Sequence, residues 1–167
     1  MKSKKLTCGL FILYFAVLVW IVLFKFRLPF VHDQLPHLRG INLIPFAGTR
    51  ITNGTTDFKE VIDNVIIFVP FGVLICTLWQ KKSLLKYVSL VLLVSLSFEI
   101  LQFVFAIGAS DITDLIANTL GGTIGAGAYF ILYKILGEKT NLIINILSLI
   151  FAVILTGLVL LITIANV

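Results

Sequence analysis

Charged residues are scarce in this chain. Only 13% of its 167 residues are charged, whereas 59% are hydrophobic, and the mean hydropathy is +1.11. A globular domain carries roughly 25% charged and about 45–50% apolar residues, so this chain has more apolar surface than one small core can bury. The composition excludes an ordinary soluble domain and indicates a membrane protein.

Recognised catalytic and metal-binding motifs are also absent. The sequence has no HExxH zinc motif, no phosphate-binding glycine loop, no CxxC pair and no Ser-His-Asp order. Cys8 and Cys76 fall near helix ends that we expect on the cytoplasmic side, where thiols stay reduced. The net charge of +5 is scattered among short loops without an RNA- or DNA-binding motif. We therefore expect no disulfide, no metal site at the cysteines, no cofactor and no nucleic-acid partner.

Long apolar runs dominate what is present. A membrane-spanning helix needs about 20 mostly apolar residues, and five segments meet this length. They predict an all-α fold: a polytopic integral membrane bundle of about five transmembrane helices in a single domain, residues 1–167, with membrane lipids as its immediate partners. The predicted spans are about 6–24, 61–79, 87–107, 115–136 and 142–165.

The distribution of lysine and arginine indicates an orientation. The amino end and the loops at 80–86 and 134–141 hold eight of these residues, against five in 25–60 and 108–114. Cytoplasmic loops carry an excess of positive charge, so we expect a cytoplasmic amino terminus, an outside carboxyl terminus and an extracellular loop at 25–60. Within that loop, the apolar sequence GINLIPF at 40–46 is expected to lie in the membrane interface or to dip between helices.

Polar residues inside the spans are the most informative. Ser95, Glu99 and Gln102 are spaced four and three apart, so they share one face of the third predicted helix. If that helix ends near Ile107, Glu99 lies about 12 Å deep at 1.5 Å per residue. A carboxylate inside a span usually faces the protein interior with a partner and marks a functional site.

The fourth predicted span continues this pattern. Asp111 and Asp114 stand in the loop before it, and Asn118 follows Asp114 by one helical turn. The same face continues to Gly121 and Gly125, a spacing that permits close approach of a neighbouring helix. More ordinary interpretations are that Asp111 faces solvent, that Asp114 caps the helix, and that the amide and glycines serve packing alone.

The second predicted span supplies the remaining candidates. Asn64 lies at its outer rim, Pro70 is expected to kink it, and Gly72 adds conformational freedom. A bend there opens space beside the outer half of the helix. We therefore expect one cavity, open to the outer leaflet and lined below by aromatic residues, at which six side chains converge: Asn64, Glu99, Gln102, Asp111, Asp114 and Asn118.

Four sequence stretches together resemble the VanZ-like membrane family: NLIPF at 42–46, IDNVIIFVPFG at 62–72, FEILQF at 98–103 and SDITDLIANTLGG at 110–122. The resemblance implies a small membrane protein that lowers susceptibility to teicoplanin and related lipoglycopeptides, without an established reaction. Where many members have an arginine before the paired aspartates, this chain has Gly108, Ala109 and Ser110, so Arg39 or Arg50 would have to supply a counter-charge. The residues carried over are Asn42, Pro45, Asn64, Pro70, Gly72, Glu99, Gln102, Asp111, Asp114, Asn118 and Gly121.

Three functional hypotheses follow for a protein of the bacterial cell membrane. The first is a resistance factor whose outward polar cavity engages a cell-envelope lipid or amphiphile, such as a lipid-linked cell-wall precursor or a lipoglycopeptide. The second is an intramembrane enzyme acting on such a precursor, with a divalent cation at Glu99, Asp111 and Asp114, because Mg²⁺ prefers carboxylate oxygens. The third is a small transporter with Glu99 as relay, although no internal repeat supports it.

Overall fold

Five long helices build the protein in this computed structural model, and each contains a stretch long and apolar enough to cross a membrane. The predicted all-α, five-span architecture is therefore confirmed. The helices are α1 (Lys4–Phe24), α2 (Lys59–Leu78), α3 (Leu84–Phe105), α4 (Ile112–Leu136) and α5 (Lys139–Ala165). The structure describes residues 4–24, 38–47, 51–52, 55–56, 58–80 and 83–165.

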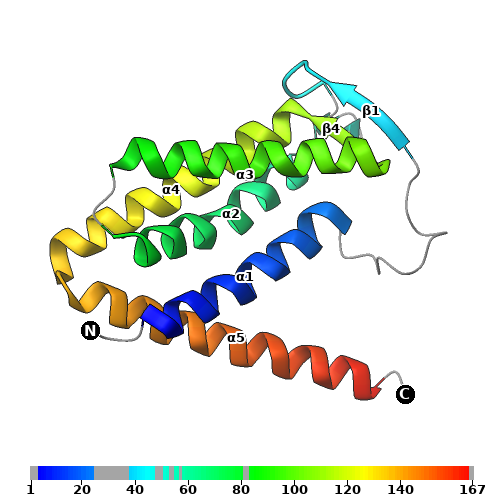
Figure 1. The fold of residues 1–167 in the computed structure, drawn as a ribbon. Coiled ribbons are helices and arrows are strands. Elements are labelled where there is room, and N and C mark those ends of the chain that lie inside the picture. Colours follow the sequence, from blue (N-terminus) through cyan, green and yellow to red (C-terminus); the bar gives the residue numbers. More distant parts are fainter. Residues whose placement is uncertain are drawn as a thin grey trace.

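Helices α2, α3 and α4 form the densest part of the bundle. Figure 1 shows α4 packed along both α2 and α3, with α1 beside α2 and α5 next to α1. Thr7 of α1 and Asn145 of α5 are both buried and exchange hydrogen bonds of 2.9 and 3.1 Å. Such interhelical polar contacts stabilise packing where lipid supplies no hydrophobic driving force.

Short strands join one end of the bundle, which the sequence did not predict. Strand β1 (Leu38–Asn42) pairs in parallel with β4 (Ile107–Asp111), in a register that places Asn42 opposite Asp111. Strands β2 (Ile51–Thr52) and β3 (Thr55–Thr56) form a separate antiparallel pair. The β1–β4 pair fixes part of the long α1–α2 connection onto the α3–α4 connection, so residues distant in sequence meet at this end (Figure 1).

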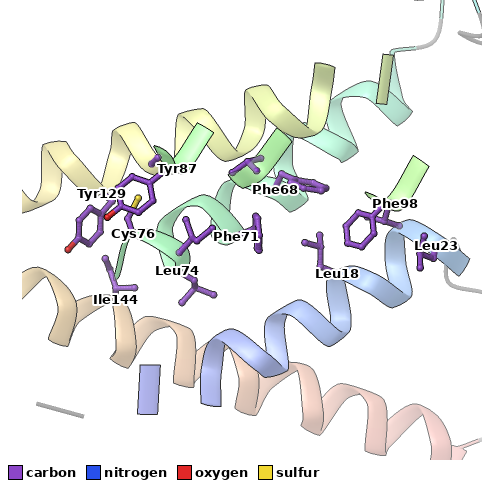
Figure 2. Packing of buried hydrophobic residues seen from close by; sticks show 14 of the residues in the cluster. Leu18, Leu23, Phe68, Phe71, Leu74, Cys76, Tyr87, Phe98, Tyr129 and Ile144 are labelled. Carbon is purple, nitrogen blue, oxygen red and sulfur yellow. The ribbon is translucent and has the colours of Figure 1, made fainter. Parts of the chain in front are cut away.

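Aromatic residues fill the core beneath the strands. Phe68 and Phe71 of α2, Phe98 of α3 and Phe15 of α1 form a closed set of four ring contacts, with centroids 5.8 to 6.3 Å apart. Figure 2 shows three of these rings together with Leu18 of α1. Aromatic pairs at such distances add to the energy of close packing, and here they connect α1, α2 and α3.

Glycines bring α2 and α4 into backbone contact. A Cβ atom added to Gly121 would collide with the carbonyl oxygen of Val65, and one added to Gly125 would collide with that of Val69. On the α2 side, Gly72 lies equally close to the backbone of α4. The two helices therefore approach along a glycine contact that no larger residue fits.

The helix bounds differ from the predicted spans by up to three residues, and two of these differences lie beside β4. Helix α3 ends at Phe105, because Ala106 adopts a left-handed conformation with φ of 54° and β4 begins at the next residue. Glu99 consequently lies six residues, about 9 Å, from the end of its helix, rather than 12 Å. Helix α4 begins at Ile112, three residues before the predicted start.

Candidate functional site

Three polar side chains meet where β1, α3 and β4 come together. The backbone N–H of Asp111 donates a 2.7 Å hydrogen bond to Glu99 Oε2, and Asn42 Nδ2 donates a 3.0 Å hydrogen bond to Asp111 Oδ2. The β1–β4 register produces this arrangement, since it sets Asn42 and Asp111 opposite each other. We call Asn42, Glu99 and Asp111 the polar triad.

Asp111 is held at both of its oxygens. Its Oδ1 accepts a 2.7 Å hydrogen bond from the backbone N–H of Thr113, which makes Asp111 the N-cap of α4. Aspartate is among the preferred residues at this position because it satisfies an N–H that has no partner within the helix. The N-cap of α4 is thus Asp111, and the alternative that Asp114 caps this helix is wrong.

Asp114 has a different partner. It lies in the first turn of α4, where the helix dipole favours a negative charge. Its Oδ1 accepts a 2.7 Å hydrogen bond from Asn64 Nδ2. This contact joins α2 to the first turn of α4, next to the polar triad.

Glu99 is the most deeply enclosed carboxylate in the described part of the chain. Only 4% of its surface is exposed, and its Oε1 has no hydrogen-bond partner among the described residues. The Ser110 side chain lies beside the Glu99 carboxyl group, but it is not placed to donate a hydrogen bond to Oε1. A buried acceptor without a partner is costly, so Oε1 can accept a hydrogen bond that the described residues do not supply.

Gln102 and Asn118 are buried beside the triad but bind elsewhere. Gln102 Nε2 donates to the carbonyl oxygen of Val22 at 3.0 Å, satisfying one of the last carbonyls of α1. Asn118 Nδ2 donates to Ser95 Oγ at 3.0 Å. Each of these two amides also keeps a buried oxygen without a partner among the described residues. The hydrogen bonds thus divide the six predicted side chains into separate groups.

An apolar cavity lies away from these polar residues. It measures about 210 Å³ and is bordered by α1, α2 and α5, with Tyr14, Pro70 and Phe151 among its lining residues. Pro70 lies inside α2, which runs without interruption from Lys59 to Leu78. The predicted outward cavity over the acidic and amide side chains stays a prediction.

The acidic residues that the structure describes do not form a three-ligand metal site. Among the described residues, no group of three histidine, cysteine, aspartate or glutamate side chains is placed to hold a metal ion. Cys8 is exposed, Cys76 is buried, and both are free thiols. Arg50 and the side chain of Arg39, the predicted counter-charges, lie outside what the structure describes.

Thr113 is a site residue that sequence reasoning missed. It is buried, and its Oγ1 accepts a 2.9 Å hydrogen bond from the backbone N–H of Phe46. Pro45 precedes Phe46 in a turn closed by Ala47 N–H and the carbonyl oxygen of Ile44 at 3.2 Å. Proline suits the second position of such a turn. No pattern in the sequence distinguishes Thr113, since its partner lies 67 residues away.

Exchanging the side chains of Asn42 and Asp111 tests the triad geometry. Asp111→Asn alone places two amide donors face to face, and Asn42→Asp alone places two carboxylates face to face, so each should destabilise the protein by about 1–3 kcal/mol. The double variant restores one donor and one acceptor and should recover most of this loss. Thermal unfolding in detergent micelles measures the effect, and equal losses in single and double variants would contradict the Asn42–Asp111 contact.

The comparisons with known proteins cover the site residues from Asn42 to Asn118. The VanZ/LLP1 family model matches residues 11–133, from α1 through most of α4. Protein VanZ of Enterococcus faecium is 44% identical over 137 residues, which cover 82% of this chain and 81% of that protein. No solved structure matches the chain. With five potential spans, and with a match to the family model that covers most of its length, the chain belongs to the VanZ/LLP1 family of membrane proteins.

Proposed function

We propose that this protein lowers the susceptibility of its host to teicoplanin and related lipoglycopeptides. Family membership supports the class of function, and the buried Glu99 carboxylate supports the site. The observation that carries the proposal is Glu99 Oε1, a buried acceptor oxygen with no partner among the described residues, beside a fixed Asn42–Asp111 contact. Ionisable groups enclosed in a membrane domain are costly, and for that reason they mark functional sites.

We further propose that the strand-bearing end of the bundle faces outward. Five of the six described lysines lie toward the opposite end, because α1, α3 and α5 begin there and α4 ends there (Figure 1): Lys4, Lys5, Lys86, Lys134 and Lys139. The sixth, Lys59, begins α2 at the strand-bearing end, where it is paired with Asp63. The positive-inside rule assigns that lysine-rich end to the cytoplasm. Both the polar triad and the carboxyl end of α5 are then on the outer side.

In this orientation the polar triad meets molecules at the outer leaflet. An unpaired acceptor oxygen selects a partner with an N–H or O–H donor. Lipid-linked cell-wall precursors and lipoglycopeptides combine such donors with an anchoring lipid chain. Engagement of either molecule by the triad would reduce the effect of a drug that acts in the membrane plane.

Expression in a susceptible Gram-positive host tests the proposed function. Teicoplanin carries an acyl chain and vancomycin has none, so the protein should raise the inhibitory concentration of teicoplanin several-fold and leave that of vancomycin unchanged. An empty vector and an equal membrane content of the protein in both drug series provide the controls. Unchanged teicoplanin susceptibility, or equal protection against both drugs, would contradict the proposal.

A further inference from the structure

An apolar strip lies exposed directly after β1. Ile41, Leu43, Ile44 and Phe46 are 61%, 73%, 68% and 48% exposed. Single exposed apolar residues are common on proteins, but a contiguous group marks an interaction surface. We call residues 41–46 the apolar strip.

The strip continues the surface of a membrane-spanning helix. The ring of Phe46 contacts that of Phe58 with centroids 6.3 Å apart. Phe58 is the N-cap residue of α2. Ile62 and Ile66 follow it at intervals of four residues, so they continue along the same face of the helix, and all three side chains are exposed. Since the face carrying Ile62 and Ile66 belongs to a span, its covering is lipid, and the strip extends that lipid-facing surface.

The backbone N–H groups in the second half of the strip have partners within the protein. Ile44 N–H donates to Asn42 Oδ1 at 3.2 Å, Phe46 N–H donates to Thr113 Oγ1 at 2.9 Å, and Pro45 has no N–H. Ala47 N–H closes the turn on Ile44. No backbone N–H from Ile44 to Ala47 therefore needs a water partner, which lowers the cost of moving this segment from bulk water into the membrane interface.

A neighbouring ion pair sets the depth of this segment. Lys59 and Asp63 form a 2.8 Å salt bridge, with side chains 78% and 53% exposed. These residues lie on the first turns of α2, beside Phe58, and their charges belong at the headgroup level. The strip is thus at the boundary between headgroups and acyl chains, where interfacial apolar segments insert.

We propose that the apolar strip inserts into the lipid leaflet at the strand-bearing end and contacts the acyl chains there. Of the two expected placements, in the interface or between helices, this assigns the first. Asn42 connects β1 to the strip, so the insertion holds the polar triad beside the leaflet. The depth of the strip in the leaflet is measured without any drug, so the result does not depend on whether the protein confers resistance.

Fluorescence quenching in vesicles tests the insertion. Leu43→Cys and Ile44→Cys, each in a Cys8→Ser background, carry an environment-sensitive fluorophore in phosphatidylcholine–phosphatidylglycerol proteoliposomes. Both positions are exposed, so the label does not disturb the core, and the buried thiol of Cys76 does not compete. Ile66→Cys is the lipid-facing control, and Lys59→Cys is the water-facing control at the same end of the bundle.

Lipids brominated on the acyl chains should quench labels at residues 43 and 44 to an extent similar to that at residue 66. Aqueous iodide should quench them several-fold less than the label at residue 59. Iodide quenching equal to that at residue 59 would overturn the proposal and place the strip in water. Protection from both quenchers would also overturn it, because a second protein chain would then cover the strip.

Discussion

Gly125→Ala should severely destabilise the bundle, while Gly127→Ala on the same helix should be tolerated. The added Cβ at residue 125 meets the carbonyl oxygen of Val69, a backbone atom that cannot rotate away, whereas nothing lies within 4 Å of the Cβ position at residue 127. Overpacking typically costs about 1–3 kcal/mol and occasionally more. Because two backbones collide here, we expect a loss of about 3 kcal/mol or more for Gly125→Ala.

Unfolding in detergent micelles and the amount of full-length protein in membranes measure this difference. The two variants add the same methyl group to the same helix, so intrinsic helix propensity and hydrophobicity cancel in the comparison. Equal behaviour of Gly125→Ala and Gly127→Ala would contradict the close α2–α4 approach.

The helices could be predicted from the sequence because the bilayer imposes a simple length rule. Each span required about 20 apolar residues, and the structure places five helices over those runs. The spacing of Gly121 and Gly125 also indicated a shared face, since residues four apart lie above one another. Their contact with Val65 and Val69 could not be predicted, because spacing identifies a face but not the helix that covers it.

The strands could not be predicted, since their formation depends on distant residues. Asn42 and Asp111 are 69 positions apart, and neither segment alternates polar and apolar residues in a way that indicates a strand. The pairing depends on the tertiary placement of Ile107–Asp111 beside Leu38–Asn42, which neither segment encodes by itself. Two of the helix bounds that differ from the prediction, Phe105 and Ile112, lie beside this same strand.

The candidate site was predictable in its residues and not in its contacts. Burial of Glu99 follows from the cost of exposing a carboxylate to lipid, and the structure encloses it. Its partner, however, is the backbone N–H of Asp111, which no side-chain pattern reveals. Likewise Asn118 shares a helix face with Asp114 but binds Ser95.

Glu99→Gln should eliminate the proposed protection against teicoplanin while the protein still folds. The glutamine carbonyl oxygen can accept the hydrogen bond from Asp111 N–H that Glu99 Oε2 accepts now. Its amide nitrogen then replaces the unpartnered Oε1 acceptor with a donor. The shape and the fold are kept, and only the charge and the acceptor are lost.

Ser97→Ala is the matched control for this variant. Ser97 lies two residues away on α3, is exposed, and donates only to the carbonyl oxygen of Leu93 at 2.7 Å within its own helix. Its replacement should leave both membrane content and drug susceptibility unchanged. Loss of activity in Ser97→Ala would show that α3 tolerates no substitution and that the effect is not specific to Glu99.

The most direct measurement is the teicoplanin inhibitory concentration of cells that express Glu99→Gln, at a membrane content equal to that of the unaltered protein. We predict a return to the value of cells with an empty vector, while Ser97→Ala keeps the full increase. Undiminished protection by Glu99→Gln would show that the enclosed carboxylate has no part in resistance.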